Sequence, residues 1–350
     1  MTKSFYIDTF KIDHQSPIFI IAELSANHNG SIETAIATIK AAKLAGADAI
    51  KLQTYTADTI TLDVKTDDFK INNGTIWDGK YLYDLYKEAH TPWEWHSQLF
   101  KAAQNEGLIC FSSPFDITAV DFLEKLNTPA YKIASFEITD IPLIEYIASK
   151  GKPVIISTGI ATLEEIEEAL SACHHQGNKD IALLKCTSAY PAPVEEANLL
   201  MIPDMAKRFQ TLVGLSDHTL GVTVAVAAVA LGAKIIEKHF ILDRKAGGPD
   251  AQFSMEPEEF KVMVESIRTV EKALGTISYD LSEKIKKNRM FARSLFVVKD
   301  IETGEELTAE NIRSIRPGDG LPPKFLNEIL GKQSKIGLLK GTPLLWDHIQ

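Results

Sequence analysis

Two histidines give the strongest metal-binding signal in the sequence. His218 lies in the segment LSDHT and His239 in EKHF, each at the end of an apolar run. Two neutral imidazoles, with water and substrate oxygens, suit Mn²⁺, Mg²⁺, Co²⁺ or a catalytic Zn²⁺. The alternative is that both histidines are structural hydrogen-bonding groups. Asp217, Asp243 and Asp250 are further candidate ligands, or partners that fix the histidine tautomer.

A second set of polar residues has the chemistry to bind a small substrate that carries a phosphate and a carboxylate. Lys51 and Lys132 end apolar runs, and so do the hydroxyl residues Ser112, Ser113, Ser135, Ser157, Thr187, Ser188 and Ser216. A lysine supplies a point charge toward phosphate, and hydroxyls add oriented hydrogen bonds. One such lysine alone more often extends to solvent, and one serine more often caps a helix, but the whole set favours anion binding. A Schiff-base lysine of the class I aldolase type is a separate hypothesis, with Lys51, Lys132 or Lys238 as nucleophile.

A single glutamate is the candidate acid or base. Glu23 lies in IAELSANHNG, at the end of the first apolar run. Burial beside Ile20 and Ile21 is expected to raise its pKa. Asn27 and His28 follow directly, and we expect them to cap the next helix rather than bind substrate.

These residues lie at the ends of eight apolar, β-branched runs, each followed by a segment of helical periodicity. The runs are residues 18–26, 48–55, 108–115, 130–136, 152–159, 181–188, 211–218 and 233–242. Near-continuous apolar runs in βα repeats are typical of parallel strands covered on both faces. The pattern predicts an α/β fold, a (β/α)8 TIM barrel whose active site lies at the C-terminal strand ends. An open doubly wound sheet is the alternative, but no G-x-G-x-x-G follows the first run.

Two regions interrupt the repeat and define the domains. Residues 56–92 form an aromatic insertion that is either a substrate-side loop or a packed cover of the barrel rim. Residues 281–350 hold 12 Lys and Arg against 9 Asp and Glu, a net charge of +3, whereas residues 1–280 carry −13. We therefore predict a barrel domain over residues 1–280 and a small α+β domain over residues 281–350.

Composition narrows the function classes. The 350 residues carry a formal net charge of −10, which does not favour binding to nucleic acid or anionic membranes. Three cysteines without C-x-x-C spacing favour neither a disulfide framework nor a zinc knuckle, and fit a reducing compartment. Neither a secretory signal nor a membrane-spanning run is recognisable. We expect a cytoplasmic protein.

Eight motifs at successive run ends resemble those of the sialic acid synthase family. They are IAELSANHNG, IKLQTY, FSSPFD, YKIASFEI, KPVIISTG, KCTSAYPAP, GLSDHT and EKHF. The tail segments RSLFVV, SIRPGDGLPP and GLLKGTPLLW are similar to the antifreeze-like (SAF) domain of those synthases. The resemblance implies condensation of phosphoenolpyruvate with an N-acetylated amino sugar, with loss of phosphate by C–O cleavage. It also implies a divalent metal, Mn²⁺ or Mg²⁺ with Co²⁺ as an alternative, and a domain-swapped homodimer.

The resemblance assigns roles residue by residue. His218 and His239 would hold the metal, and Glu23, Lys51 and Lys132 would be the catalytic residues. Phosphoenolpyruvate would be held by Lys51, Ser113, Lys132, Ser135, Ser157, Ser188 and Ser216. Ser188 stands where the sialic branch often has Asn. The sugar would be bound by Glu137, Tyr190, Asp250 and Arg316, the last reaching across the dimer.

The acceptor branch is implied by the insertion. The segment TIWDGKYLYDLYKEAHTPWEWH is similar to the branch that uses a 2,4-diacetamido-2,4,6-trideoxy-altropyranose. The alternatives are the acceptors of N-acetylneuraminate or legionaminate synthases. Use of the product on flagella or a surface polysaccharide is implied by the resemblance alone.

Overall fold

The computed structural model describes residues 3–350 and divides the chain into two compact units. One unit ends at Gly275, and the other spans Thr276–Gln350. The sequence analysis predicts this boundary at residue 280.

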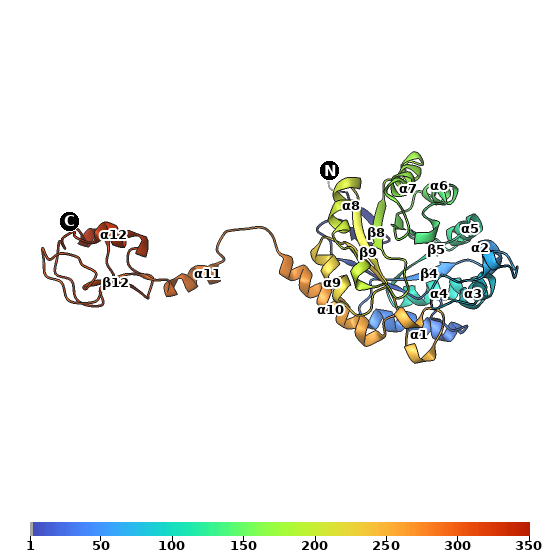
Figure 1. The fold of residues 1–350 in the computed structure, drawn as a ribbon, viewed down its shortest axis with the longest axis horizontal. Coiled ribbons are helices and arrows are strands. Elements are labelled where there is room, and N and C mark those ends of the chain that lie inside the picture. Colours follow the sequence, from blue (N-terminus) through green and yellow to red (C-terminus); the bar gives the residue numbers. More distant parts are fainter. Residues whose placement is uncertain (1–2) are drawn as a thin grey trace. The chain divides into compact units, whose positions relative to one another are not determined.

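The first unit is a closed barrel of eight parallel strands surrounded by helices (Figure 1). The strands are β3 (Phe19–Glu23), β4 (Ala49–Thr54), β5 (Ile109–Pro114), β6 (Tyr131–Ile133), β7 (Val154–Ser157), β8 (Ile181–Cys186), β9 (Leu212–Asp217) and β10 (Ile235–His239). Pairing of β10 with β3 closes the barrel. The predicted TIM barrel is confirmed, and each strand lies within its predicted run.

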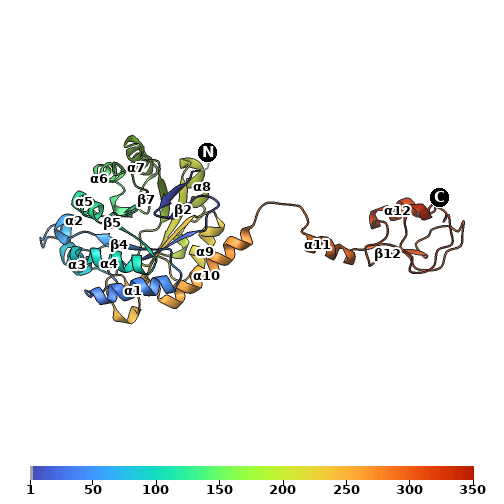
Figure 2. The same ribbon diagram turned by 180° about the vertical axis from the view of Figure 1, so that it is seen from behind.

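A helix follows each strand before the next one begins, and these helices surround the barrel in both views (Figures 1 and 2). They are α1 (Ile32–Leu44), α4 (Trp93–Asn105), α5 (Ile117–Lys125), α6 (Ile141–Ala148), α7 (Leu163–His175), α8 (Met201–Phe209), α9 (Thr223–Ala230) and α10 (Pro257–Leu274). Ser31 caps α1 by accepting a hydrogen bond from the backbone N–H of Thr34. The expectation that Asn27 or His28 caps this helix is wrong. Asn27 instead donates to Phe240 O and Ser254 Oγ.

The barrel interior changes from apolar to polar along the strands. Inward-facing apolar side chains fill the N-terminal half together with the hairpin of β1 (Phe5–Ile7) and β2 (Phe10–Ile12). Period-two alternation then places polar residues on the same inward face toward the C-terminal ends, such as Glu23 after Ile21 and Glu237 after Ile235. The polar end of the barrel is therefore the face on which a site can form.

The insertion after β4 is partly helical. It contains α2 (Ala57–Ile60), a 3₁₀ turn (Asp67–Phe69) and α3 (Leu82–Ala89), after which Pro92 starts α4. We call residues 57–89 the insertion segment.

The second unit is a small α+β module with its own core. Its sheet pairs β11 (Ser294–Val297) with β12 (Ile312–Ile315) in antiparallel register, and its helices are α11 (Glu283–Asn288) and α12 (Leu326–Ile329). Its core is formed by Leu295, Val297, Ile301, Leu307, Ile312, Leu321, Ile329, Leu338, Leu344 and Ile349. Across residues 3–350, none of the helices has both the length and the apolar character that crossing a membrane requires.

Candidate active site

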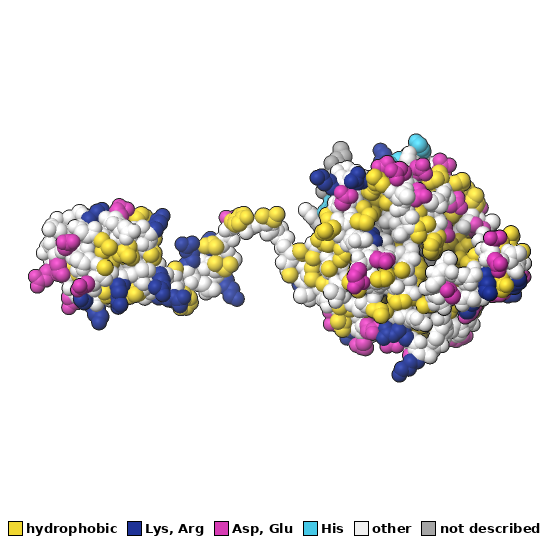
Figure 3. Space-filling view, viewed as in Figure 1, with side chains coloured by type: hydrophobic (Ala, Val, Ile, Leu, Met, Phe, Trp, Pro, Cys, Tyr) yellow, Lys and Arg dark blue, Asp and Glu magenta, His cyan; other side chains and the backbone are white. Residues whose placement is uncertain are grey.

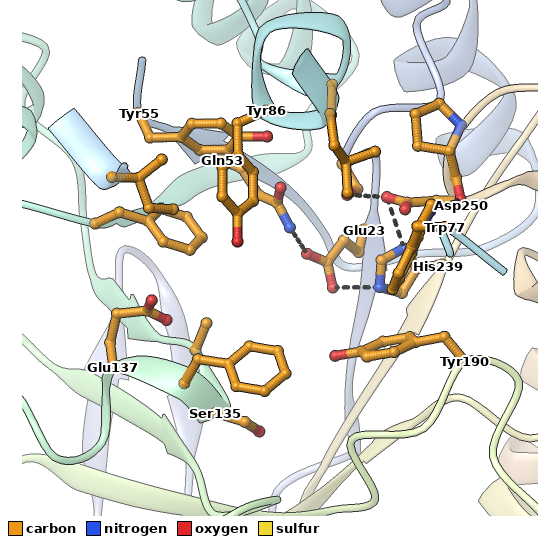
Figure 4. A pocket seen from close by; sticks show the side chains of 18 of the residues that line it. Glu23, Gln53, Tyr55, Trp77, Tyr86, Ser135, Glu137, Tyr190, His239 and Asp250 are labelled. Atoms are coloured by element: carbon orange, nitrogen blue, oxygen red, sulfur yellow. Dashed lines mark hydrogen bonds and ion pairs between the residues drawn. The ribbon is translucent and has the colours of Figure 1, made fainter. Parts of the chain in front are cut away.

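A cavity of about 560 Å³ lies at the C-terminal ends of the barrel strands. Strand ends and the segments that follow them supply its lining, including Glu23, Lys51, Lys132, Ser135, Glu137, Ser157, Tyr190, Ser216, His218, His239 and Asp250. Figure 4 shows Glu23, Gln53 and His239 on one side of the cavity and Ser135 and Glu137 on another. The barrel thus brings together most of the residues singled out from the sequence.

Two lysines and two carboxylates form the floor of the cavity. Lys51 Nζ lies 2.8 Å from Glu23 Oε1 and 3.1 Å from Glu237 Oε1. Lys132 Nζ lies 3.6 Å from Glu237 Oε1 and donates to Ser157 Oγ at 2.6 Å. All four charged side chains are almost completely buried. Their formal charges cancel, so Glu237 allows two ammonium groups to share a buried site.

These contacts set the protonation of the floor. Burial raises the pKa of Glu23, but the charges of Lys51 and His239 outweigh it, and the pKa lies below its ordinary value. The expectation of a raised pKa is therefore wrong, because the sequence does not reveal that Lys51 contacts this carboxylate. Burial lowers the pKa of Lys132, with Glu237 opposing it. Burial also acts to lower the pKa of Lys51, but the charges of Glu23 and Glu237 outweigh burial, and the pKa of Lys51 is raised.

The two candidate metal-binding histidines lie side by side, with ring centroids 5.4 Å apart. His218 Nδ1 is 3.0 Å from the carbonyl oxygen of Thr187, which can only accept, so Nδ1 carries a proton, and Nε2 is the nitrogen that has a lone pair when the ring is neutral. His239 Nε2 is 3.3 Å from Glu23 Oε2, and its buried Nδ1 has no hydrogen-bond partner. In residues 3–350 no three His, Cys, Asp or Glu side chains converge as a complete metal site. The chemistry of the groups present nevertheless suits a divalent ion, since two imidazoles lie near the carboxylates of Glu23 and Asp250, which are 3.3 and 3.8 Å from His239.

Three serines place hydroxyl groups around the cavity. Ser135, Ser157 and Ser216 line it, and Ser216 Oγ donates to Glu237 Oε1 at 3.2 Å. Ser135 Oγ accepts a hydrogen bond from the backbone N–H of Gly159 at 3.2 Å. A Cβ at Gly159 would lie 2.7 Å from Ser135 Oγ and 2.1 Å from Ser188 Oγ, so only glycine lets these hydroxyls approach the backbone. Hydroxyl groups gathered around the cavity in this way can donate hydrogen bonds to an oxyanion.

The residues expected to bind sugar lie around the same cavity. Burial raises the pKa of Glu137 to about 7, and its Oε2 is buried without a partner. The Tyr190 ring packs 4.5 Å from that of His218. Asp250 Oδ2 accepts hydrogen bonds from Ser25 Oγ and from the backbone of Ala26. The side chains of Glu137, Tyr190 and Asp250 thus line the same cavity as the two histidines, where a ligand can reach them.

Some residues singled out from the sequence lie elsewhere. Ser113 and Ser188 are not in the cavity lining, although Ser188 Oγ is 3.9 Å from Cys186 Sγ, which does line it. Lys238 also lies outside the lining, and its ammonium binds Asp217 Oδ2 at 2.6 Å. Lys238 is therefore not a candidate nucleophile for the Schiff-base hypothesis. Arg316 belongs to the second unit.

Other lining residues were not assigned from the sequence. Glu237 is the most important, because it contacts both floor lysines, and Gln53 Nε2 donates to Glu23 Oε1 at 3.0 Å (Figure 4). The signal that predicts them is strand alternation. Glu237 stands two residues before His239, and Gln53 two after Lys51, so each shares the inward face of its strand.

The insertion aromatics divide between the two interpretations. Trp77 and Tyr86 line the cavity, as the substrate-side interpretation expects. Trp93 and Trp95 lie in α4 directly after the insertion, where Trp93 stacks on Phe122 and Trp95 packs against His28, as expected of a packed cover.

Comparison with known proteins identifies the relatives of both units. Residues 38–279 match the NeuB family, and residues 292–350 match the SAF domain. The chain is 51% identical over 338 residues to the pseudaminic acid synthase of Campylobacter jejuni, covering 97% of this chain and 98% of that protein. It is 50% identical over 335 residues to the pseudaminic acid synthase of Helicobacter pylori, covering 95% of this chain and 98% of the relative.

A solved structure gives the same architecture. The N-acetylneuraminic acid (sialic acid) synthetase of Leptospira borgpetersenii, in complex with citrate, superimposes with a TM-score of 0.73 at 32% identity. The match covers 82% of this chain and 95% of that one.

Proposed function

Because this chain belongs to the NeuB family, we propose that it catalyses the reaction of a pseudaminic acid synthase. It condenses phosphoenolpyruvate with 2,4-diacetamido-2,4,6-trideoxy-β-L-altropyranose to give pseudaminic acid and phosphate. The observation that carries this proposal is 51% identity over nearly the full length to an enzyme of that name. The charged floor beside two histidines supplies groups for both substrates.

The floor holds the donor in this proposal. Lys51 and Lys132 bind the phosphate and carboxylate of phosphoenolpyruvate, and Ser135, Ser157 and Ser216 add hydrogen bonds. Ser113 and Ser188 belong to the same proposed set, although neither lines the cavity. Because the donor carries its charge before it reacts, these residues contribute mainly by positioning it beside the acceptor aldehyde.

The reaction forms one carbon–carbon bond and breaks one carbon–oxygen bond. C3 of phosphoenolpyruvate attacks the aldehyde carbon of the open-chain sugar, whose oxygen becomes a hydroxyl. Water adds at C2 and loses a proton, and the resulting tetrahedral intermediate expels phosphate to leave a ketone at C2. Glu23, an anion held against Lys51, accepts and returns protons at the water and the new hydroxyl.

His218 and His239 would hold a divalent metal, Mn²⁺ or Mg²⁺ with Co²⁺ as an alternative. A bound metal supplies Lewis-acid polarisation of the aldehyde oxygen. The hydrogen bond that fixes a proton on His218 Nδ1, and the 5.4 Å separation of the two rings, support this assignment.

Sugar binding is assigned to Glu137, Tyr190 and Asp250, with Arg316 contributed by the second copy of a domain-swapped homodimer. The cavity supports the first three, because each of them lines it. A cytoplasmic location is part of the proposal, and the free thiols of Cys110, Cys173 and Cys186 support a reducing compartment.

The test is phosphate release from phosphoenolpyruvate with Mn²⁺, comparing the altro acceptor with N-acetylmannosamine and detecting the nine-carbon product by mass. Activity confined to the altro sugar is expected. Activity on N-acetylmannosamine would assign the chain to the sialic branch instead. Borohydride with pyruvate should leave the protein unlabelled, whereas a trapped lysine adduct would indicate a class I aldolase.

A further inference from the structure

The wall that the insertion segment contributes to the cavity differs in chemistry from the floor. Its residues in the lining include Ile60, Ile71, Trp77, Leu82, Leu85 and Tyr86. The polar lining residues of the same segment are Asp68 and Asn73, which are exposed, and Lys70, which is half-buried like Ile71 and Leu82. One side of the cavity therefore offers apolar surface, while the floor offers paired charges.

Aromatic contacts place this wall beyond the histidine pair. The Tyr190 ring lies 4.5 Å from His218, and the Trp77 ring lies a further 5.5 Å from Tyr190. Trp77 is held there because its Nε1 donates to Pro249 O at 2.9 Å. Figure 4 shows Trp77 and Tyr190 near His239 at one side of the cavity. An acceptor with its aldehyde at the histidines thus extends its far end toward the insertion segment.

We propose that this apolar wall is the subsite for the C6 methyl group of the acceptor, and that it makes the enzyme selective for 6-deoxy sugars. The inference rests on the proposed function, whose acceptor ends in a methyl group where N-acetylmannosamine has a hydroxymethyl group. A methyl group gains from burial against Ile71 and Leu82. A hydroxyl at the same place loses its water without gaining a partner.

The first experiment compares two acceptors that differ at C6 alone. They are 2,4-diacetamido-2,4,6-trideoxy-altrose and its 6-hydroxy analogue, 2,4-diacetamido-2,4-dideoxy-altrose. We expect kcat/KM to be about 100-fold higher for the 6-deoxy sugar, because an apolar pocket discriminates against an added hydroxyl group by roughly that factor. Equal use of the two sugars would overturn the subsite and leave the proposed function standing. If neither sugar is used, the proposed function and the inference fall together.

The second experiment changes the wall and uses matched controls. Ile71→Thr keeps a β-branched shape and adds a hydroxyl, whereas Ile76→Thr makes the same change at an exposed side chain outside the lining. Leu82→Asn is paired in the same way with Leu62→Asn. Both wall variants should lower the ratio of kcat/KM for the 6-deoxy sugar to kcat/KM for the 6-hydroxy sugar at least about tenfold, because the 6-hydroxy sugar is used better. Both controls should keep the wild-type ratio.

The ratio is measured within each variant, so partial unfolding lowers both rates and cancels. A wall variant that keeps the wild-type ratio would place the C6 group elsewhere in the cavity and contradict the inference. A control that changes the ratio as much as its wall partner would do the same.

Discussion

Glu23 stays ionised although it is buried, because Lys51 Nζ is 2.8 Å away. Glu23→Ala should lower kcat by about 10²- to 10⁴-fold, the usual contribution of a positioned acid or base. The barrel should still fold, because Lys51 keeps its contact with Glu237, but with lower stability, because two buried ammonium groups then share one carboxylate. Phosphate-release kinetics and circular dichroism check both parts. Unchanged activity would end the catalytic assignment of Glu23.

Glu137 should make stability depend on pH. Burial raises its pKa to about 7 from an ordinary value of 4.5, so the folded state binds this proton more tightly than the unfolded state. The stability it contributes is complete below pH 4.5 and is lost as pH rises through 7. Relative to Glu137→Gln, the wild type should lose up to about 3 kcal/mol of unfolding free energy across that range. Urea unfolding at pH 5 and pH 8 measures this, with exposed Glu168→Gln as control.

The histidine pair predicts metal dependence. Chelation should abolish phosphate release, and added Mn²⁺ should restore it, because two imidazoles with open positions bind metal reversibly. His218→Ala and His239→Ala should each weaken Mn²⁺ binding measured by calorimetry. Full activity in the chelated protein would show that the two histidines are structural.

At the scale of elements, the register of β9 against β10 holds Ser216 opposite Glu237. Gly214 allows this close approach, since a Cβ there would lie 2.3 Å from Ile235 O. Gly214→Ala should destabilise the barrel by about 1–3 kcal/mol, the range for overpacking. It should also raise KM for phosphoenolpyruvate as the two strands separate. Gly337→Ala, whose nearest Cβ neighbour is 3.8 Å away, should melt like the wild type.

The strands could be predicted from sequence because covered parallel strands are almost continuously apolar. The contacts that the inward-facing side chains make could not be predicted from sequence, and Glu237 shows why. Its neighbour Lys238 looks equally suitable for catalysis, yet alternation turns one into the barrel and the other toward Asp217. The strand predicted over residues 130–136 ends at Ile133, because Ser135–Glu137 forms a 3₁₀ turn. That turn is supported by Gly159, which is distant in sequence.

Long-range contacts also decided which aromatic residues face the cavity. Trp77 lies in the insertion and Trp93 begins α4 directly after it, and the composition of this aromatic-rich stretch does not separate them. Trp77 is turned to the cavity by Pro249, whereas Trp93 donates to the backbone of Tyr55 at 3.1 Å and stacks on Phe122. The sequence therefore predicts that aromatic residues cover the barrel rim, but not which of them form the wall of the cavity.

At the scale of the whole molecule, the two regions carry opposite net charges, −13 over residues 1–280 and +3 over residues 281–350. On the visible face of the barrel unit both signs of charge are interspersed (Figure 3). The proposed domain swap assigns Arg316 to the acceptor site of the other subunit. Arg316→Ala should therefore raise KM for the sugar and leave KM for phosphoenolpyruvate nearly unchanged.

Complementation distinguishes a swapped dimer from a site completed within one chain. In a mixed dimer of Arg316→Ala and Glu23→Ala subunits, swapping puts both defects in one site and leaves the other site intact. Co-expression followed by purification through two different tags should then recover about half of the wild-type activity per dimer. The assay uses a sugar concentration well below the KM of the Arg316→Ala variant. If Arg316 acts within its own chain, each site of the mixed dimer then carries one defect, and the activity stays at the level of the single variants. Because either single variant is impaired alone at this sugar concentration, recovered activity can come only from a site that combines Glu23 of one chain with Arg316 of the other.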